Sequence, residues 1–238
     1  MCEEDSEGGS APCLLHELGA DGAVVDPQQA RDVARWRKVQ RERLLASRMA
    51  MQAKLRTELT ALLIEQLSRI VPADGRIVSL YWPIRGEPDL REWMRERAGL
   101  GSRIALPIAT ALGHPLEFRE WRPGVRMARG LWKIPYPADG AEVQPAVVIA
   151  PLVGFDRQGF RLGYGGGFFD RTLARLTPRP LVIGVGYVSG ALETIFPQPH
   201  DIGMDWIVTN EAPPQRFARD TRAPSVDSSG SVTSGPVT

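Results

Sequence analysis

Cysteine is nearly absent from this 238-residue chain, which contains only Cys2 and Cys13, both near its start. Two cysteines exclude a disulfide-stapled scaffold and a cysteine-based zinc site. Histidine is also scarce, at three residues, and there is no serine elbow to accompany one of them. We therefore expect a protein of a reducing compartment whose chemistry depends on other side chains.

Long apolar runs are missing as well, because none approaches the roughly 20 residues that span a bilayer. The start of the chain lacks the basic and apolar regions of a secretory signal. The formal net charge of +1 favours no nucleic-acid or membrane partner. We expect a soluble, cytoplasmic protein, and a monomer, since no zipper seam is present.

The balanced total hides an uneven charge distribution. Residues 1 to 26 carry acidic side chains and no lysine or arginine, whereas residues 31 to 48 are rich in arginine. We predict a mobile acidic N-terminal extension over 1–27, a disordered C-terminal tail over 215–238, and a single α/β domain over 28–214. The arginines of the predicted first helix form a solvated basic face, or one or two of them point inward to a ligand.

Apolar patterns predict strands that alternate with helices, which is typical of an α/β sheet. A first helix begins near Asp26 or Asp32, and a second, over 51–70, presents a core face of leucines that includes Leu55, Leu62, Leu63 and Leu67. Short helices are predicted over 90–99, 168–176 and 191–195. Strands are predicted over 76–82, 103–108, 116–121, 146–153, 181–188 and 205–209. The proline-rich segment 131–137 is predicted to be extended, not helical.

The most informative stretch is GFDRQGFRLGYGGGFFDR, residues 154 to 171, directly after the apolar run 146–153. It is neither a Walker A loop nor a Rossmann fingerprint, because no lysine follows the glycines and the sixth fingerprint position is Phe168. Two interpretations remain, a tight turn or a phosphate cradle at a helix start. Arg157, Arg161 and Arg171 favour an anion. Asp170 suits either Mg²⁺ or a helix cap.

Further candidates lie where other predicted elements end. Glu87 follows the strand over 76–82, and ligands of open α/β sheets bind at the carboxyl ends of strands, whereas Asp89 suits a helix N-cap. Trp132 is suited to the core or to a platform under a flat ring. We expect His200 to be structural, and Asp201 to be a hard oxygen ligand or a group that orients one.

Several of these segments, in this order, resemble the 5-formyltetrahydrofolate cyclo-ligase family over about residues 31 to 210. The most specific segment is the glycine stretch, which is similar to the family signature FDxxGxRLGxGxGYYDR. GEPD at 86–89, LPI at 106–108, W-x-I-P-x-P at 132–137, and PHD followed by VTN support it. The resemblance implies a three-layer, mostly parallel, Rossmann-like sheet flanked by helices, of the NagB/RpiA/CoA-transferase-like kind.

The resemblance also implies a ligase that forms a C–N bond. Such an enzyme uses ATP as co-substrate and Mg²⁺ as cofactor to convert 5-formyltetrahydrofolate to 5,10-methenyltetrahydrofolate, with release of ADP and phosphate. The formyl oxygen attacks the γ-phosphate, and N10 then closes the ring. Positioning and charge neutralisation serve phosphoryl transfer without a covalent nucleophile.

Site residues follow from the resemblance, position by position. Arg161 and Asp170 are implied to be catalytic, and Asp170 and Asp201 to hold the metal. The substrate contacts implied are Glu87, Trp132, Tyr164 and Phe168. The ATP contacts implied are Arg37, Arg161, Leu162, Gly163, Tyr164, Gly165, Gly166, Gly167, Phe168 and Phe169.

Two positions depart from the family pattern. The lysine of K-x-x-L-R, four residues before Arg37, is Val33, and the aromatic pair YYD is FFD at Phe168 and Phe169. Two alternatives therefore stay open. One is a catalytically impaired relative that binds folate or nucleotide; the other is a sugar-phosphate isomerase-like enzyme, for which the sequence offers no separate signal.

Overall fold

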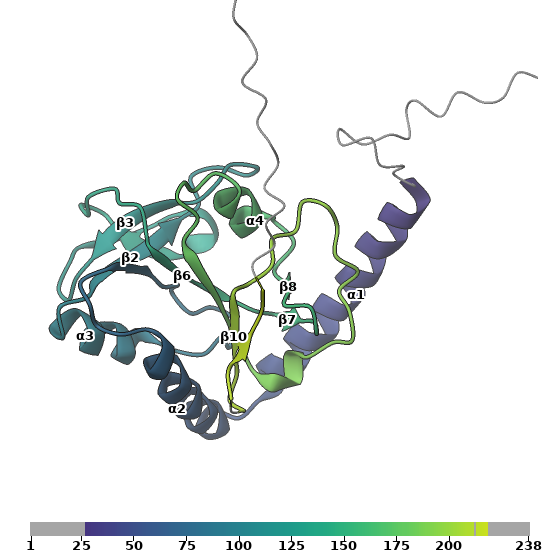
Figure 1. The fold of residues 1–238 in the computed structure, drawn as a ribbon, viewed down its shortest axis with the longest axis horizontal. Coiled ribbons are helices and arrows are strands. Elements are labelled where there is room, and N and C mark those ends of the chain that lie inside the picture. The colour runs from purple at the N-terminus through teal and green to yellow at the C-terminus, as the bar shows by residue number, and fades with distance from the viewer. Residues whose placement is uncertain (1–26, 212, 219–238) are drawn as a thin grey trace, which may run out of the picture.

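The computed structural model describes residues 27–211 and 213–218, and these residues form an α/β fold around a seven-stranded sheet (Figure 1). The strand order is β11-β10-β9-β6-β1-β2-β3. Neighbouring strands from β10 to β2 are parallel, and each edge strand is antiparallel to its neighbour. The bounds are β1 Ile77–Ser79, β2 Arg103–Ile108, β3 Glu117–Trp121, β6 Val147–Pro151, β9 Leu181–Val185, β10 Trp206–Val208 and β11 Gln215–Arg216.

Helices cover both faces of the sheet, as Figure 1 shows for α2 and α3 on one side and α4 on the other. Alternate residues of β6 separate the two cores, because Val147 and Ile149 face one side and Val148 and Ala150 the other. The mostly parallel sheet flanked by helices confirms the predicted fold class. The helices are α1 Pro27–Ala50, α2 Ala53–Ile70, α3 Arg91–Gly99 and α4 Phe168–Leu173.

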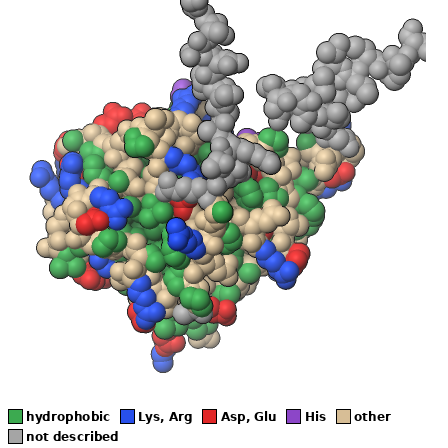
Figure 2. Space-filling model, in the orientation of Figure 1, with side chains coloured by type: hydrophobic (Ala, Val, Ile, Leu, Met, Phe, Trp, Pro, Cys, Tyr) green, Lys and Arg blue, Asp and Glu red, His purple; other side chains and the backbone are tan. Residues whose placement is uncertain are grey.

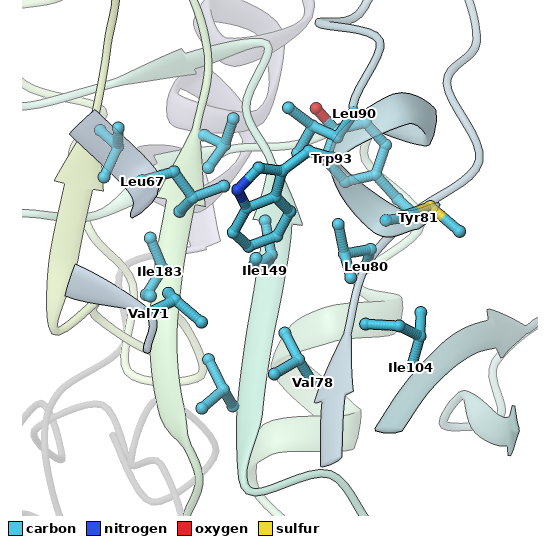
Figure 3. Close-up of a cluster of buried hydrophobic side chains, with 14 of the residues drawn as sticks. Leu67, Val71, Val78, Leu80, Tyr81, Leu90, Trp93, Ile104, Ile149 and Ile183 are labelled. Atoms are coloured by element: carbon cyan, nitrogen blue, oxygen red, sulfur yellow. The ribbon is translucent and has the colours of Figure 1, made fainter. Parts of the chain in front are cut away.

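The larger core lies between the sheet and the pair α2 and α3. Trp93 of α3 packs beside Leu67 of α2 and Ile149 of β6 (Figure 3), and its indole N–H donates to Ser68 at 2.8 Å. The predicted core face of α2 is only partly right. Leu63 and Leu67 are fully buried, but Leu55 and Leu62 are 45% and 47% exposed, because the buried stripe is narrower than the run of leucines.

Local predictions differ from the structure in several places. The segment predicted to be extended over 131–137 is extended only in its second half, where β5, Pro135–Pro137, pairs with β4, Met127–Arg129, whereas a 3-10 turn, η2, covers Leu131–Lys133. A 3-10 turn, η3, at Val188–Gly190 replaces the helix predicted over 191–195. Strand β11 lies beyond residue 214, since Gln215 pairs with Ile207, so the described fold continues past the predicted domain end. Most of the predicted N-terminal extension (1–27) and C-terminal tail (215–238), namely residues 1–26 and 219–238, lies outside the described residues.

The strand order reverses at the middle of the sheet, and this places the site. Strand β1 lies between β6 and β2, so the chain turns to one side after β1 and later builds on the other side from β6. In open α/β sheets, ligands bind at the carboxyl ends of strands beside such a reversal. The segment after β1 carries Glu87, and the segment after β6 carries the glycine stretch.

Candidate functional site

A short hairpin follows β6 and presents the glycine loop. Its strands are β7, Gly154–Phe155, and β8, Arg161–Leu162. The carboxylate of Asp156, which is 1% exposed, accepts the backbone N–H groups of Gln158, Phe160 and Ile195. The FDRQG part of the stretch is therefore a rigid structural turn, and the loop that begins at Gly163 is the part open to a ligand.

Guanidinium groups pack against alternate glycines of this loop, residues 163 to 167. A Cβ atom on Gly163 would lie 2.3 Å from Nη1 of Arg161, and one on Gly165 would lie 3.2 Å from Cζ of Arg41. Arg41 comes from α1, and its Nε donates to the Gly163 carbonyl at 2.7 Å. A side chain at Gly163 would displace the Arg161 guanidinium, and Gly165 is favoured both by its φ of 91° and by the nearby Arg41.

A third guanidinium, that of Arg171, completes the set. A Cβ atom on Gly167 would lie 2.7 Å from its Nη1, and its Nη2 donates to the Gly166 carbonyl. The Nε atoms of Arg161 and Arg171 are buried and have no hydrogen-bond partner. Buried donors without a partner beside three guanidinium groups are suited to an anionic ligand.

The two phenylalanines that replace the tyrosine pair support these cations. The Phe169 ring lies 5.0 Å from Cζ of Arg161, and the Phe168 ring lies 5.5 Å from Cζ of Arg171. Trp132 packs edge-to-face on Phe168, with ring centroids 5.4 Å apart. Trp132 is 61% exposed, so it is not a core residue, and its φ of 54° holds it in an unfavourable backbone conformation.

The two candidate metal ligands are each paired with an arginine. Asp170 accepts from Arg161 at 2.9 Å and from the N–H of Ile202 at 3.3 Å, so it does not cap α4. Asp201 accepts from Arg37 through both oxygens, at 2.5 and 3.2 Å. Within the described ranges, no group of three or more His, Cys, Asp or Glu side chains is placed to hold a metal ion.

Arg41 is a site residue that sequence reasoning missed. Arg37 uses its donors on Asp201 and on the carbonyls of Ile195 and Phe196, whereas Arg41, one helical turn later, reaches the glycine loop. Val33, which stands at the lysine position of K-x-x-L-R, is a buried helix residue. Arg41 is a further cation of the same helix, and it contacts the glycine loop.

Electrostatics at Arg41 agree with an anion site. Burial lowers its pKa, and the positive charge of Arg37 lowers it further. Two partly buried cations on one helix face repel each other, and a bound anion relieves that repulsion.

Glu87 is 3% exposed and lies beneath the loop. Its Oε2 accepts the N–H of Ile84 at 2.9 Å, and its Oε1 accepts the hydroxyl of Tyr164 at 2.7 Å. The Tyr164 hydroxyl in turn accepts from Nη2 of Arg48 at 2.5 Å. Burial raises the pKa of Glu87 to about 7, although its hydrogen bonds and the charges of Arg48 and Arg85 oppose the shift. Burial and the Glu87 charge raise the pKa of Tyr164.

Three other candidates lie outside this arrangement. Arg157 pairs with Glu193 on the surface, at 2.8 Å. The side chain of His200 is 76% exposed, so it is neither a core residue nor part of a metal group in the described structure. Leu90 precedes the first residue of α3, and the Asp89 carboxylate accepts the backbone N–H of Arg91 at 3.1 Å, the kind of bond predicted for a helix cap. The same carboxylate pairs with the Arg91 guanidinium.

Comparisons with known proteins identify the relatives of this chain. The model of the 5-formyltetrahydrofolate cyclo-ligase family matches residues 33–210. A 5-formyltetrahydrofolate cyclo-ligase of Mycolicibacterium smegmatis is 35% identical over 143 residues, which are 57% of this chain and 74% of the relative. One from Escherichia coli K12 is 36% identical over 106 residues, which are 40% of this chain and 56% of that protein.

A solved structure agrees as well. The NMR structure of Aquifex aeolicus 5,10-methenyltetrahydrofolate synthetase superposes with a TM-score of 0.67 at 26% identity, and the match covers 80% of this chain and 98% of that one. The family match, the relatives and this fold together show that the chain belongs to the 5-formyltetrahydrofolate cyclo-ligase family.

Proposed function

We propose that this chain catalyses the ATP-dependent closure of 5-formyltetrahydrofolate to 5,10-methenyltetrahydrofolate, with release of ADP and phosphate. The observation that carries the proposal is the set of three guanidinium groups, from Arg41, Arg161 and Arg171, against alternate glycines of one loop. This loop lies at the carboxyl edge of the sheet, where such folds bind ligands. The names of the relatives support the same activity.

The proposed chemistry is balanced at each step. The formyl oxygen attacks the γ-phosphorus of ATP, an O–P bond forms, and ADP leaves as the β–γ bridge breaks. N10 then attacks the activated formyl carbon, loses its proton, and expels phosphate with the former formyl oxygen. The charge that develops on the phosphoryl oxygens falls beside Arg41, Arg161 and Arg171, whose positive charges stabilise it.

The carboxylates take different proposed roles. Asp170, which lies beside the loop, would hold Mg²⁺ together with ATP phosphate oxygens, a mixed ligand set that this ion favours. The ion supplies charge neutralisation when bound. Asp201 is held by Arg37 through both of its oxygens, and we assign it to fixing Arg37 next to Arg41.

The folate half of the site is proposed to include Glu87, Trp132 and Phe168. Exposed Trp132 sits edge-to-face on Phe168, so its ring is available as a wall for the flat pterin. Glu87 is the nearby acceptor suited to pterin N–H donors. Its carboxylate lies under Tyr164, which makes Tyr164 part of both halves.

Partners and location belong to the same proposal: a cytoplasmic monomer that uses ATP and 5-formyltetrahydrofolate and binds neither nucleic acid nor membrane. In support, basic and acidic side chains are interspersed on the face shown in Figure 2 and form no continuous basic field there. Among the described residues, no helix has the length and apolarity that crossing a membrane requires.

The direct test mixes the purified protein with ATP, Mg²⁺ and 5-formyltetrahydrofolate. The near-ultraviolet absorbance of the methenyl product should develop, in a buffer that preserves the product, with one phosphate released per ring closed. No product at high protein concentration, with both ligands bound, would identify an impaired relative instead.

A matched pair of variants on α1 tests the phosphate site. Arg41→Gln should lower kcat/KM for ATP at least about 10-fold, because it removes a charge-assisted contact. Arg43→Gln, at an exposed position of the same helix, should stay within about 2-fold of the parent protein. Equal effects of the two changes would contradict the assignment of Arg41.

A further inference from the structure

Arg48 is a buried arginine to which the activity proposed above assigns no part. It is 6% exposed and lies on α1, on the same face as Arg37 and Arg41. Its Nε donates to the carbonyl of Arg85 at 2.9 Å and its Nη1 to the carbonyl of Leu152 at 3.0 Å. Its Nη2 donates to the hydroxyl of Tyr164. One guanidinium therefore joins the segment after β1, the end of β6 and the glycine loop.

The segment held by Arg48 is a tight turn that carries Glu87. The N–H of Glu87 donates to the carbonyl of Ile84 at 3.0 Å, and the two central residues, Arg85 and Gly86, have φ angles of 46° and 74°. A positive φ is unfavourable for arginine, so surrounding contacts have to maintain it. The bond from Arg48 to the Arg85 carbonyl is such a contact, and it positions the Glu87 carboxylate indirectly.

Tyr164 connects this turn to the phosphate loop. Its hydroxyl donates to Glu87, while its backbone lies between Gly163, whose carbonyl accepts from Arg41, and Gly165, against which the Arg41 guanidinium packs. An anion that drew Arg41 away from the Gly163 carbonyl would remove a contact on each side of Tyr164. Tyr164 is therefore placed to transmit a change at the loop to Oε1 of Glu87.

We propose that Arg48 and Tyr164 are positioning residues that couple the two substrate sites: with the loop empty they hold Glu87 covered, and nucleotide phosphates at the loop release it to bind the reduced folate. The inference rests on the proposed function, because it takes the loop as the nucleotide site and Glu87 as the folate contact. Since coupling between two binding equilibria is reciprocal, each ligand raises the affinity for the other by the same factor.

Charges around Glu87 are consistent with a carboxylate that changes its partners. Burial raises the pKa of Glu87, whereas the hydrogen bond from Tyr164 and the charges of Arg48 on α1 and Arg85 in its own turn act to lower it. Burial and the charge of Glu87 in turn raise the pKa of Tyr81, in the segment after β1. When Tyr164 withdraws, Oε1 keeps two nearby cations but loses its donor, so an N–H donor of the substrate replaces the hydroxyl with no unpaired buried charge.

The test is calorimetric titration of 5-formyltetrahydrofolate into the full chain, with and without a non-hydrolysable ATP analogue and Mg²⁺. In the parent protein the analogue should tighten folate binding about 5-fold or more, the lower end of typical couplings. The coupling ratio is the folate Kd without the analogue divided by the folate Kd with it. Tyr164→Phe removes only the hydroxyl, and its coupling ratio should fall below about 2-fold while both ligands still bind. Arg48→Gln should also lower the coupling ratio, and Arg43→Gln should keep the parent value.

The outcomes are distinguishable. If the parent protein binds neither ligand, the proposed function fails and the inference fails with it. If the parent protein binds both ligands and forms product, but the ratio is near 1 or Tyr164→Phe keeps the parent ratio, only the inference is overturned. Thermal melting shows whether Arg48→Gln is folded. If it is not, the titration of Tyr164→Phe tests the inference without it.

Discussion

Arginines of one helix take three different environments in this protein. Arg37, Arg41 and Arg48 lie with Leu44 on the inward face of α1, whereas Arg43 is exposed on the opposite side. Spacings of three and four residues place side chains on one helix face. This basic helix, whose sequence resembles a solvated surface element, therefore contributes a contact with the glycine loop from Arg41 and a buried clamp from Arg48.

Glu87 gives a prediction on pH and stability at the scale of a single residue. Its pKa is about 7 in the folded protein and 4.5 for the free side chain, so the native state holds a proton that the unfolded state has lost between these values. The free energy of unfolding should therefore fall as pH rises from about 4.5 through 7, by up to about 3 kcal/mol. Glu87→Gln should remove this contribution.

The measurement is urea unfolding of the parent protein and of Glu87→Gln at several values between pH 5 and pH 8. The free energy of unfolding of the parent protein minus that of Glu87→Gln should change with pH over this range. A difference in stability that the amide causes at every pH shifts this value by a constant and does not affect the comparison. Glu120→Gln is the control, because Arg103 lowers the pKa of Glu120 and moves its titration below the window. Parallel curves for the parent and Glu87→Gln would rule out the raised pKa.

At the scale of an element, the glycine loop works because its glycines admit cations. A methyl group at Gly163 would collide with Nη1 of Arg161, the end of a flexible side chain, and Gly163 has no positive φ that alanine would strain. Gly163→Ala should therefore push Arg161 aside with little loss of stability. We expect kcat/KM for ATP to fall at least about 10-fold, in line with the loss of a charged contact.

Steady-state kinetics and thermal melting together check this prediction. Gly99→Ala, at the end of α3, is the matched control, since a Cβ there meets nothing within 4 Å. It should leave kcat/KM for ATP unchanged. A Gly163→Ala protein with parental kinetics would show that Arg161 is not needed where it lies.

At the scale of the whole molecule, the sheet brings together two ends that are far apart in the sequence. The core between α2, α3 and the sheet supports the ends of β1 and β6, from which Glu87 and the glycine loop project. Leu67→Ala should lower the free energy of unfolding by about 2 to 5 kcal/mol, because it opens a cavity at a fully buried position. Leu62→Ala, on the exposed side of α2, should cost less than about 1 kcal/mol.

Urea unfolding monitored by far-ultraviolet circular dichroism measures both changes. Similar losses for the two leucines would mean that α2 buries a wider face than the structure describes.

Strong local patterns made much of the fold predictable. The alternation of apolar runs with helical segments gave the parallel sheet, and the glycine stretch was found from its spacing and its arginines. Weak local patterns misled, as at η2, where prolines suggested an extended chain but Trp132 adopts a positive φ. The contact of Arg41 with the loop was not predicted, because Arg37 and Arg41 are of one residue type and lie one turn apart on the same helix face.

The class of fold, the family and the glycine loop as a candidate anion site were predictable from the sequence, because these depend on periodicity and on residue types at short spacing. Three long-range contacts became visible only in the folded structure: Arg41 with the loop, Arg37 with Asp201 across 164 residues, and Tyr164 with Glu87. Such pairings depend on how distant segments pack, and local sequence does not encode them.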